Sequence, residues 1–235
     1  MNYKPFHLCV ALKTPLITNG RLTLDAILSA ARFRATADPE RACSDLPLRN
    51  TNGVWHGSAA LFEQPVRYTG IPFVQRLHGE QDWSLELFSV SRRVRGDVKI
   101  NRSGGPYVAR LDCHKACAVR HVHFFGCGEG QQAAQLIRRY LPGLGSKTNH
   151  GFGMIDTISV NPMSSDRALL NTAGFPMRPL PLTFWQDMAK PLTEDEVAIN
   201  EEGWRPPYWD PSNWAICAVP VVRDVDDVYL NEWIN

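Results

Sequence analysis

Residues 143–153 read GLGSKTNHGFG, a stretch that holds four glycines, one lysine and one histidine. Glycine adopts backbone dihedral angles that other residues avoid and lets a ligand approach the main chain closely. Free backbone N–H groups in such a loop form a concave anion site, to which Lys147 adds a mobile positive charge. This stretch, the glycine loop, therefore predicts a phosphate site. The alternative is a glycine-rich turn that binds no ligand.

The surroundings of the glycine loop argue against a nucleotide hydrolase. The phosphate-binding motif of such enzymes places a glycine directly before its lysine and runs from a strand into a helix. Here Ser146 precedes Lys147. The loop also follows a predicted helix over residues 131–141 and precedes a predicted strand over residues 154–160. Both the motif and the order of elements therefore differ from those of a nucleotide hydrolase.

The rest of the chain supplies the other elements of one α+β domain. Hydrophobic patterns predict strands at 6–12, 53–66 and 119–127 and helices at 22–35 and 129–140. Thr23 can cap the first helix, and Asp25 in its first turn suits the helix dipole. Residues 68–79 are expected to form a connection and residues 83–90 a half-buried strand. The order of elements predicts a ferredoxin-like (RRM-like) domain with an antiparallel sheet over residues 1–162.

Positive charge is concentrated in one segment of a nearly neutral chain. The 235 residues carry a formal net charge of +1, yet residues 92–120 contain eight basic and two acidic residues. The sequence SGGP at residues 103–106 is a strong turn signal and suggests a hairpin. We expect a basic, thumb-like insertion at about residues 91–120 that binds a polyanion. The alternative is a solvated charged loop.

Proline and tryptophan dominate the C-terminal part of the chain. Five of the seven tryptophans follow residue 180, and the segments RPLP and WRPPYW are extended and bounded by proline. We expect residues 163–235 to form a Pro/Trp-rich segment that packs on the domain as a wrapped tail. The alternative is an exposed aromatic surface for a neighbouring protein.

Three stretches resemble the RAMP superfamily, which supplies subunits of CRISPR RNA-guided complexes. The stretch that runs from VHFFGCGEG to LIRRYLPGLGSKTNHGFGMI resembles the second half of a RAMP ferredoxin-like domain. The sequence TPLITNG followed by LTLDAILSAARFR resembles the start of the RAMP subunits of type IV CRISPR systems. The segments RPLPL and RPPYW resemble the C-terminal part of the type IV subunit that caps the complex at the 5′ end of the guide.

This resemblance implies a noncatalytic subunit that binds the 5′ handle of the CRISPR guide RNA. It also implies contacts with the backbone and large subunits of the same complex, and with target DNA near the protospacer-adjacent motif. No cofactor, metal or membrane contact is expected. The residues expected to contact RNA lie in the glycine loop, the basic insertion and the first helix: Gly145, Ser146, Lys147, Thr148, Asn149, His150, Gly151, Phe152, Gly153, Arg92, Arg93, Arg95, Lys99, Arg102 and Arg34.

The alternative function is a metal-independent endoribonuclease that processes CRISPR RNA precursors. Such an enzyme needs a general base and a cation that stabilises the phosphorane. His150 and Lys147 could supply them, with His7 or His56 joining from neighbouring strands. Nothing in the sequence brings these side chains together.

Cysteine and histidine residues cluster within residues 113–127, and their types suit zinc. They are Cys113, His114, Cys117, His121, His123 and Cys127. Their spacing matches no common zinc finger, so a zinc site remains an alternative to core and edge positions. The six cysteines are expected to be reduced. Because the sequence lacks a signal peptide and a long apolar run, we expect a cytoplasmic protein.

Overall fold

The computed structural model describes residues 3–18, 21–63, 66–75, 108–188, 197–220 and 224–225. The chain divides into two compact units, which are described separately. One unit comprises Met1–Tyr68 and Cys117–Asn235, and the other comprises Thr69–Ala116. The predicted boundary between residues 162 and 163 stays a prediction. Five residues of the basic insertion that were expected to bind RNA lie outside the described residues: Arg92, Arg93, Arg95, Lys99 and Arg102.

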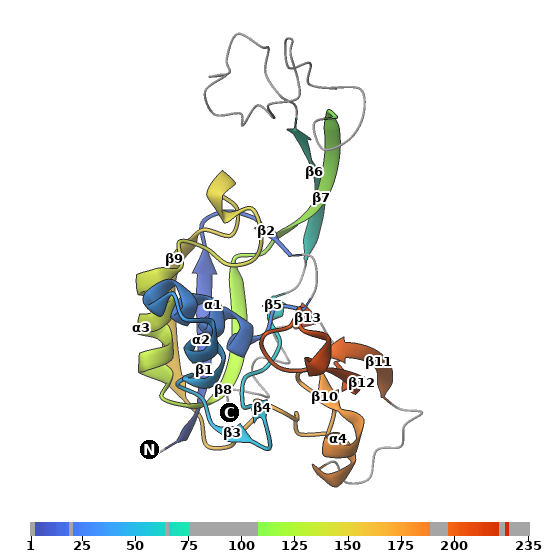
Figure 1. Ribbon diagram of the computed structural model, residues 1–235. Coiled ribbons are helices and arrows are strands. Elements are labelled where there is room, and N and C mark those ends of the chain that lie inside the picture. The colour runs from blue at the N-terminus through green and yellow to red at the C-terminus, as the bar shows by residue number, and fades with distance from the viewer. Residues whose placement is uncertain are drawn as a thin grey trace, which may run out of the picture. The chain divides into compact units, whose positions relative to one another are not determined.

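The larger unit is built on a sheet with the strand order β13-β5-β8-β1-β9 (Figure 1). Along the chain its main strands are β1 (Lys4–Leu12), β5 (Leu61–Glu63), β8 (His121–Gly128) and β9 (Ile155–Pro162). Each neighbouring pair among these four strands is antiparallel. One helix follows β1 and another follows β8, which gives the ferredoxin-like order β-α-β-β-α-β. The predicted α+β, ferredoxin-like fold is therefore confirmed. At the sheet edge, β13 (Asp224–Val225) pairs in parallel with β5.

The two helices α1 (Leu24–Thr36) and α3 (Gly130–Tyr140) pack together on one face of this sheet (Figure 1). Successive side chains of a strand point to opposite faces. In β1, Leu8 and Val10 accordingly join the main hydrophobic core with the helices, whereas His7 faces the opposite way. Burial of this apolar face supplies most of the driving force for folding. The sheet thus has one apolar face under the helices and one face that carries histidines.

Short elements complete the larger unit. Before β5 they are β2 (Leu16–Ile17), α2 (Pro39–Ser44), β3 (Asn50–Thr51) and β4 (Val54–Trp55). After β9 they are β10 (Leu180–Pro181), α4 (Leu182–Met188), β11 (Ala198–Gly203) and β12 (Trp214–Val219). The strands β10, β12 and β11 form a second, antiparallel sheet. Trp185 of α4 is buried in a small core with Leu180, Ala218 and Val54.

Two predictions about the middle of the chain are wrong. The strand expected over residues 53–66, with an irregularity at Gly57, is divided into β4 and β5 by a bend at His56, and the backbone of Gly57 bridges to β8. Residues expected to form a connection instead form β6 (Arg67–Gln75), which lies beside β7 (Arg110–Ala118) in a sheet (Figure 1). Pro72 is tolerated because β6 is an edge strand. The expected strand over residues 83–90 lies outside the described residues.

A buried ion pair ties the C-terminal segment to α1. The guanidinium of Arg178 is fully buried and donates to Asp25 Oδ2 at 3.0 Å. It also donates to the carbonyl oxygens of Trp55 and Trp204, both at 2.6 Å. The hydroxyl of Tyr208 donates to Asp25 Oδ2 at 2.9 Å. We call Arg178, Asp25 and Tyr208 the Arg178 cluster.

This cluster corrects the prediction for the start of the first helix. Thr23 makes no side-chain cap to α1, because its hydroxyl lies 2.8 Å from the hydroxyl of Tyr208. Asp25 is wholly buried and pairs with a full positive charge. The helix therefore begins at a tertiary contact with the C-terminal segment rather than at a local cap.

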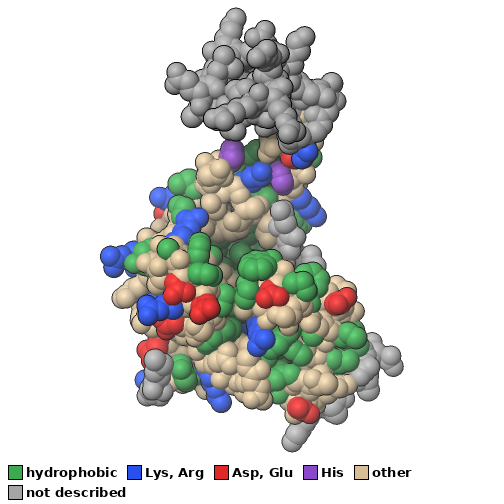
Figure 2. Space-filling model, viewed as in Figure 1, with side chains coloured by type: hydrophobic (Ala, Val, Ile, Leu, Met, Phe, Trp, Pro, Cys, Tyr) green, Lys and Arg blue, Asp and Glu red, His purple; other side chains and the backbone are tan. Residues whose placement is uncertain are grey.

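The C-terminal segment was expected either to pack on the domain as a wrapped tail or to expose an aromatic surface, and its tryptophans show both behaviours. Trp185 is buried, as a wrapped tail requires. In contrast, Trp209 is 81% exposed and Trp214 48% exposed, and hydrophobic side chains reach the surface in the region of β11 and β12 (Figure 2). Trp233 lies outside the described residues. The segment therefore buries one part of its aromatic content and displays another.

All six cysteines lie within the described ranges, where each is a free thiol. No helix in these ranges is both long enough and apolar enough to cross a membrane.

Candidate nucleic-acid interface

The glycine loop connects the end of α3 with the start of β9 and contains the short 3-10 helix η4 (Thr148–His150). Backbone hydrogen bonds hold it against the segment that follows β1. The N–H of Ser146 donates to the carbonyl of Ile17 at 2.7 Å, and that of Gly153 donates to the carbonyl of Pro15 at 2.8 Å. Within the loop, Leu144 N–H donates to the carbonyl of Gly153 at 2.8 Å. The loop is therefore a folded element with fixed ends.

Packing explains three of the four glycines in this loop. A Cβ on Gly145, whose φ is +77°, would overlap the carbonyl oxygen of Ile17, and one on Gly153, whose φ is +63°, would overlap that of Leu144. A Cβ on Gly143 would lie 2.7 Å from the carbonyl oxygen of Gly153. The sequence had been interpreted as leaving these positions open for a ligand. The structure shows instead that neighbouring main chain occupies the space.

Gly151 and Lys147 are different, because close packing does not explain their conformation. Gly151 has a φ of +84°, but the nearest atom to an added Cβ is the Met154 sulfur, at 4.0 Å. Lys147 also has a positive φ, +59°, which costs a residue with a side chain roughly 1–2 kcal/mol. Strained backbone of this kind is often found at functional sites. These two residues flank η4 and set the shape of the exposed part of the loop.

The start of η4 presents backbone donors. Among the described residues, no acceptor lies within hydrogen-bonding reach of the N–H groups of Thr148 and Asn149. The first N–H groups of any helix lack partners inside the helix. The side chain of His150 is exposed, with its Nδ1 2.9 Å from Asn149 Oδ1. Phe152 is half-buried behind these residues. The loop thus offers two amide donors beside the positive charge of Lys147.

Arg34 of α1 contacts the chain just before the glycine loop. Its guanidinium donates to the carbonyl oxygen of Tyr140 at 3.2 Å, at the C-terminal end of α3. The side chain is exposed and lies two residues before the end of α1. Arg34 therefore contributes positive charge at the entrance of the glycine loop.

The other histidines considered for catalysis occupy different environments. His7 is 3% exposed, and its Nε2 lies 2.9 Å from His123 Nδ1 on the face of the sheet that lacks helices. Burial and the charge of His123 lower the pKa of His7 to about 4. Glu63 accepts hydrogen bonds from His121 at 2.9 Å and from His123 at 3.1 Å. Within the described ranges, no group of three or more potential ligands is arranged to hold a metal ion.

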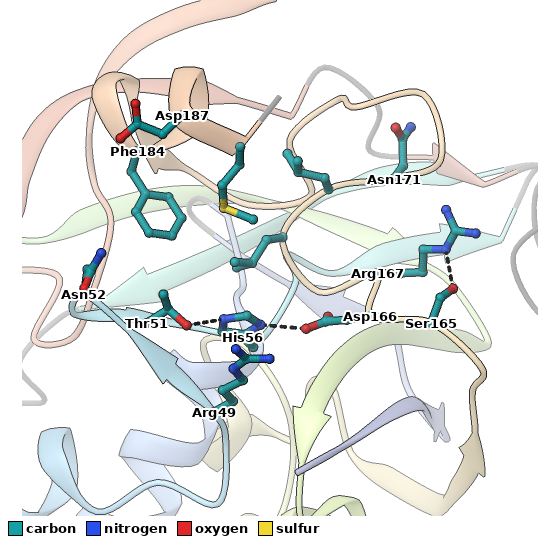
Figure 3. Close-up of a pocket in the computed structure, with 13 residues that line it drawn as sticks. Arg49, Thr51, Asn52, His56, Ser165, Asp166, Arg167, Asn171, Phe184 and Asp187 are labelled. Carbon is teal, nitrogen blue, oxygen red and sulfur yellow. Dashed lines mark hydrogen bonds and ion pairs between the residues drawn. The ribbon is translucent and has the colours of Figure 1, made fainter. Parts of the chain in front are cut away.

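His56 lines a pocket of about 660 Å³ in the larger unit (Figure 3). Its Nδ1 lies 2.6 Å from Asp166 Oδ2, and its Nε2 lies 2.8 Å from Thr51 Oγ1. Burial acts to raise the pKa of Asp166, but the hydrogen bond and charge of His56, together with hydrogen bonds from the Ala168 backbone and Cys127, outweigh burial, so the pKa is lowered. The other lining residues are Arg49, Asn52, Ser165, Arg167, Leu169, Leu170, Asn171, Phe184, Asp187 and Met188.

Sequence reasoning found His56 but missed this pocket. The partner Asp166 is 110 residues away from His56 along the chain, in the connection between β9 and β10. The sequence placed His56 in a predicted strand and Asp166 in the predicted C-terminal tail. Neither prediction indicates that the two residues share a cavity. No local pattern around Asp166 indicates that it faces a histidine.

A comparison with protein families identifies the chain. Residues 4–220 match the model of the family described as "CRISPR type IV associated protein Csf3". The chain belongs to this family. The resemblance to a type IV CRISPR subunit of the RAMP superfamily is therefore confirmed, and the match includes the glycine loop, Arg34 and the residues around His56.

Comparison with curated proteins finds no match. Among solved structures, the chain is similar to a chain of the "Cryo-EM structure of the Type III-B Cmr-beta bound to cognate target RNA". The two chains are 11% identical with a TM-score of 0.32, and the similarity covers 68% of this chain and 61% of that one. The fold assignment rests on the strand order described above and not on this likeness.

Proposed function

We propose that this Csf3-family protein is a noncatalytic RNA-binding subunit of a type IV CRISPR complex that caps the 5′ handle of the guide RNA. The observation that carries the proposal is the exposed part of the glycine loop. There, a lysine in a strained conformation precedes two backbone N–H groups that lack a described acceptor. The family match places this loop in a CRISPR-associated protein.

The loop would bind the sugar-phosphate backbone rather than the bases. The N–H groups of Thr148 and Asn149 would donate to phosphate oxygens, while Lys147 and Arg34 neutralise charge. Contacts of this kind position a nucleic acid without reading its sequence. Each neutralised phosphate makes the affinity more dependent on salt. The basic insertion would add further contacts to the RNA phosphates. Other parts of the surface would contact the backbone and large subunits of the complex, and target DNA near the protospacer-adjacent motif.

Support for a noncatalytic role comes from the separate environments of the three candidate histidines, which share no hydrogen-bond partner among the described residues. His150 lies on the loop, His7 is buried beside His123, and both ring nitrogens of His56 have protein partners. A general base must reach the proton that it abstracts. Incubation of the purified protein with a repeat-containing transcript in EDTA should leave the transcript intact. Site-specific cleavage would support the endoribonuclease alternative instead.

The binding test compares Gly151→Val with the parent protein on labelled 5′-handle RNA. Valine is a poor fit at a positive φ and would change the shape of the loop, although the surrounding space is open. We expect weaker RNA binding with most of the thermal stability retained. Lys4→Ala is the control, because Lys4 is an exposed lysine at the start of β1. If Gly151→Val binds RNA as tightly as Lys4→Ala does, the glycine loop is not the phosphate site.

A further inference from the structure

The pocket beside His56 has the size and lining of a small-molecule site. Its volume of about 660 Å³ lies within the range of roughly 300–1,000 Å³ that is typical of ligand pockets. One part of its wall is apolar and includes Leu169, Phe184 and Met188. The lining also includes the polar side chains of Arg49 and His56 (Figure 3). A ligand that fits both parts must combine a flat or apolar portion with an anionic portion.

We propose that this pocket binds a single nucleoside monophosphate unit, either a free nucleotide or an unstacked nucleotide of an RNA strand. The two sources share a base, a sugar and a phosphate. The proposal goes beyond the RNA-backbone contact assigned to the glycine loop, and it does not depend on that contact.

Phe184 provides the surface for the base. Its ring projects from α4 into the pocket, towards the side that carries Thr51 and His56 (Figure 3). Proteins bind unstacked bases by stacking them on aromatic rings and by hydrogen bonds to the base edges. The amide of Asn52, on the turn between β3 and β4, supplies both a donor and acceptor at the pocket wall. Leu169 and Met188 add apolar contact.

Arginines provide the site for the phosphate. The guanidinium of Arg49 lies beside the ring of His56 (Figure 3). Arg167 donates through Nε to Ser165 Oγ at 3.1 Å, and its two terminal nitrogens have no acceptor among the described residues. A guanidinium binds phosphate through two parallel hydrogen bonds. The pocket therefore presents two such groups from different segments of the chain.

Two aspartates also line the pocket, so its lining carries as many carboxylates as guanidinium groups. Asp166 is held by His56 and accepts the backbone N–H of Ala168 at 2.9 Å. The carboxylate of Asp187 points away from the centre of the pocket (Figure 3). Thr51 and Asp166 hold the ring of His56 from both sides, which fixes its orientation in the pocket wall.

The test is ligand-detected NMR and calorimetry on the full-length protein with AMP, GMP, CMP and UMP, each compared with its nucleoside and with inorganic phosphate. We expect saturable binding of at least one monophosphate, with a Kd in the micromolar to millimolar range. Its nucleoside and phosphate alone should bind at least about tenfold more weakly, because each occupies only one part of the pocket. Failure of all four monophosphates to bind saturably would overturn the proposal.

Variants locate the binding. Arg49→Gln and Phe184→Leu should each weaken monophosphate binding about tenfold, which corresponds to about 1.4 kcal/mol. The control is Arg41→Gln, because Arg41 is an exposed arginine on α2 whose partner is Asp38. Melting temperatures establish that each variant is folded. If both pocket variants bind like Arg41→Gln, the nucleotide binds elsewhere and the proposal fails.

Competition separates the two sources. If 5′-handle RNA displaces the bound monophosphate, the occupant is a nucleotide of the strand. If RNA and monophosphate bind together, the pocket takes a free nucleotide. Lys147→Ala should leave monophosphate binding unchanged. The two proposals can fail separately. If the protein binds a monophosphate but no RNA, the proposed RNA-binding function is refuted and the nucleotide pocket is supported.

Discussion

The glycine loop and the Arg178 cluster place polar groups in opposite environments, one at the surface and one in the interior. The loop is contiguous and partly exposed, so its character is visible in eleven consecutive letters. The Arg178 cluster is dispersed and buried, and its ion pair joins residues 153 positions apart. A charge in water needs no partner, whereas a buried charge is costly unless it is paired and hydrogen-bonded. Changes in the cluster should therefore affect stability, and changes in the exposed loop should affect binding.

The largest expected effect comes from Arg178→Met. This variant leaves Asp25 buried without its partner, so the free energy of unfolding should fall by about 3–5 kcal/mol. Urea denaturation followed by circular dichroism measures the change. Arg41→Met is the matched control, because its ion pair with Asp38 is exposed and should contribute less than about 1 kcal/mol. If the free energy of unfolding falls equally in the two variants, the buried ion pair contributes no more to stability than the exposed one, and the comparison fails.

A pH titration extends the comparison to the histidines of the sheet. The pKa of folded His7 is about 4, below the ordinary value of 6.5. Between these values the unfolded chain binds a proton that the folded protein does not, so stability is full above pH 6.5 and falls on acidification towards pH 4. The expected loss is about 3 kcal/mol at 1.36 kcal/mol per unit. Denaturant unfolding at several pH values should show a flatter profile for His7→Gln. An unchanged profile would assign the acid sensitivity to other groups.

Two glycine variants sharpen the comparison inside the loop. Gly153→Ala and Gly151→Ala both place alanine at a positive φ, but only Gly153→Ala also forces a Cβ against the Leu144 carbonyl. Gly153→Ala should therefore be less stable than Gly151→Ala by roughly 1–3 kcal/mol, the usual cost of overpacking. Thermal and denaturant melting measure this difference. If the two variants melt alike, the packing explanation for Gly153 is wrong.

The smallest expected effect is that of Lys147→Ala. Most of the proposed grip on phosphate comes from main-chain N–H groups, so RNA affinity should fall by about tenfold, or 1.4 kcal/mol. The slope of log affinity against log salt should decrease, since one phosphate contact is lost. Fluorescence anisotropy over a salt series provides both values, with Lys4→Ala as control. A lost affinity with an unchanged slope would indicate that Lys147 acts on loop shape rather than on charge.

The order of elements was predictable because it depends on local signals. Alternating or helical hydrophobic patterns placed β1, β8, β9, α1 and α3 close to their observed positions. The strand β6 was missed because pairing with β7 overrides the local effect of Gly70 and Pro72. Neighbouring strands can impose extended structure on residues that favour turns.

The sites were predicted less completely than the fold. The glycine loop was recognised by composition, but the reason for three of its glycines is contact with the main chain of Ile17 and of the loop itself, which no single sequence reveals. Asp25 was interpreted through its local helix dipole, because its partner Arg178 is distant in sequence. The pocket around His56 required the same kind of distant information.

The Arg178 cluster also constrains how this protein can change through evolution. Loss of Asp25 would leave the buried Arg178 without its anionic partner, and loss of Arg178 would leave the buried Asp25 without its cationic partner. Tyr208 hydrogen-bonds to both residues. Single substitutions should thus be rare among functional descendants, and divergence at these positions should occur through paired replacement by apolar residues. In sequence families, the three positions should vary together as one inherited character, even though they are spread over α1 and the C-terminal segment.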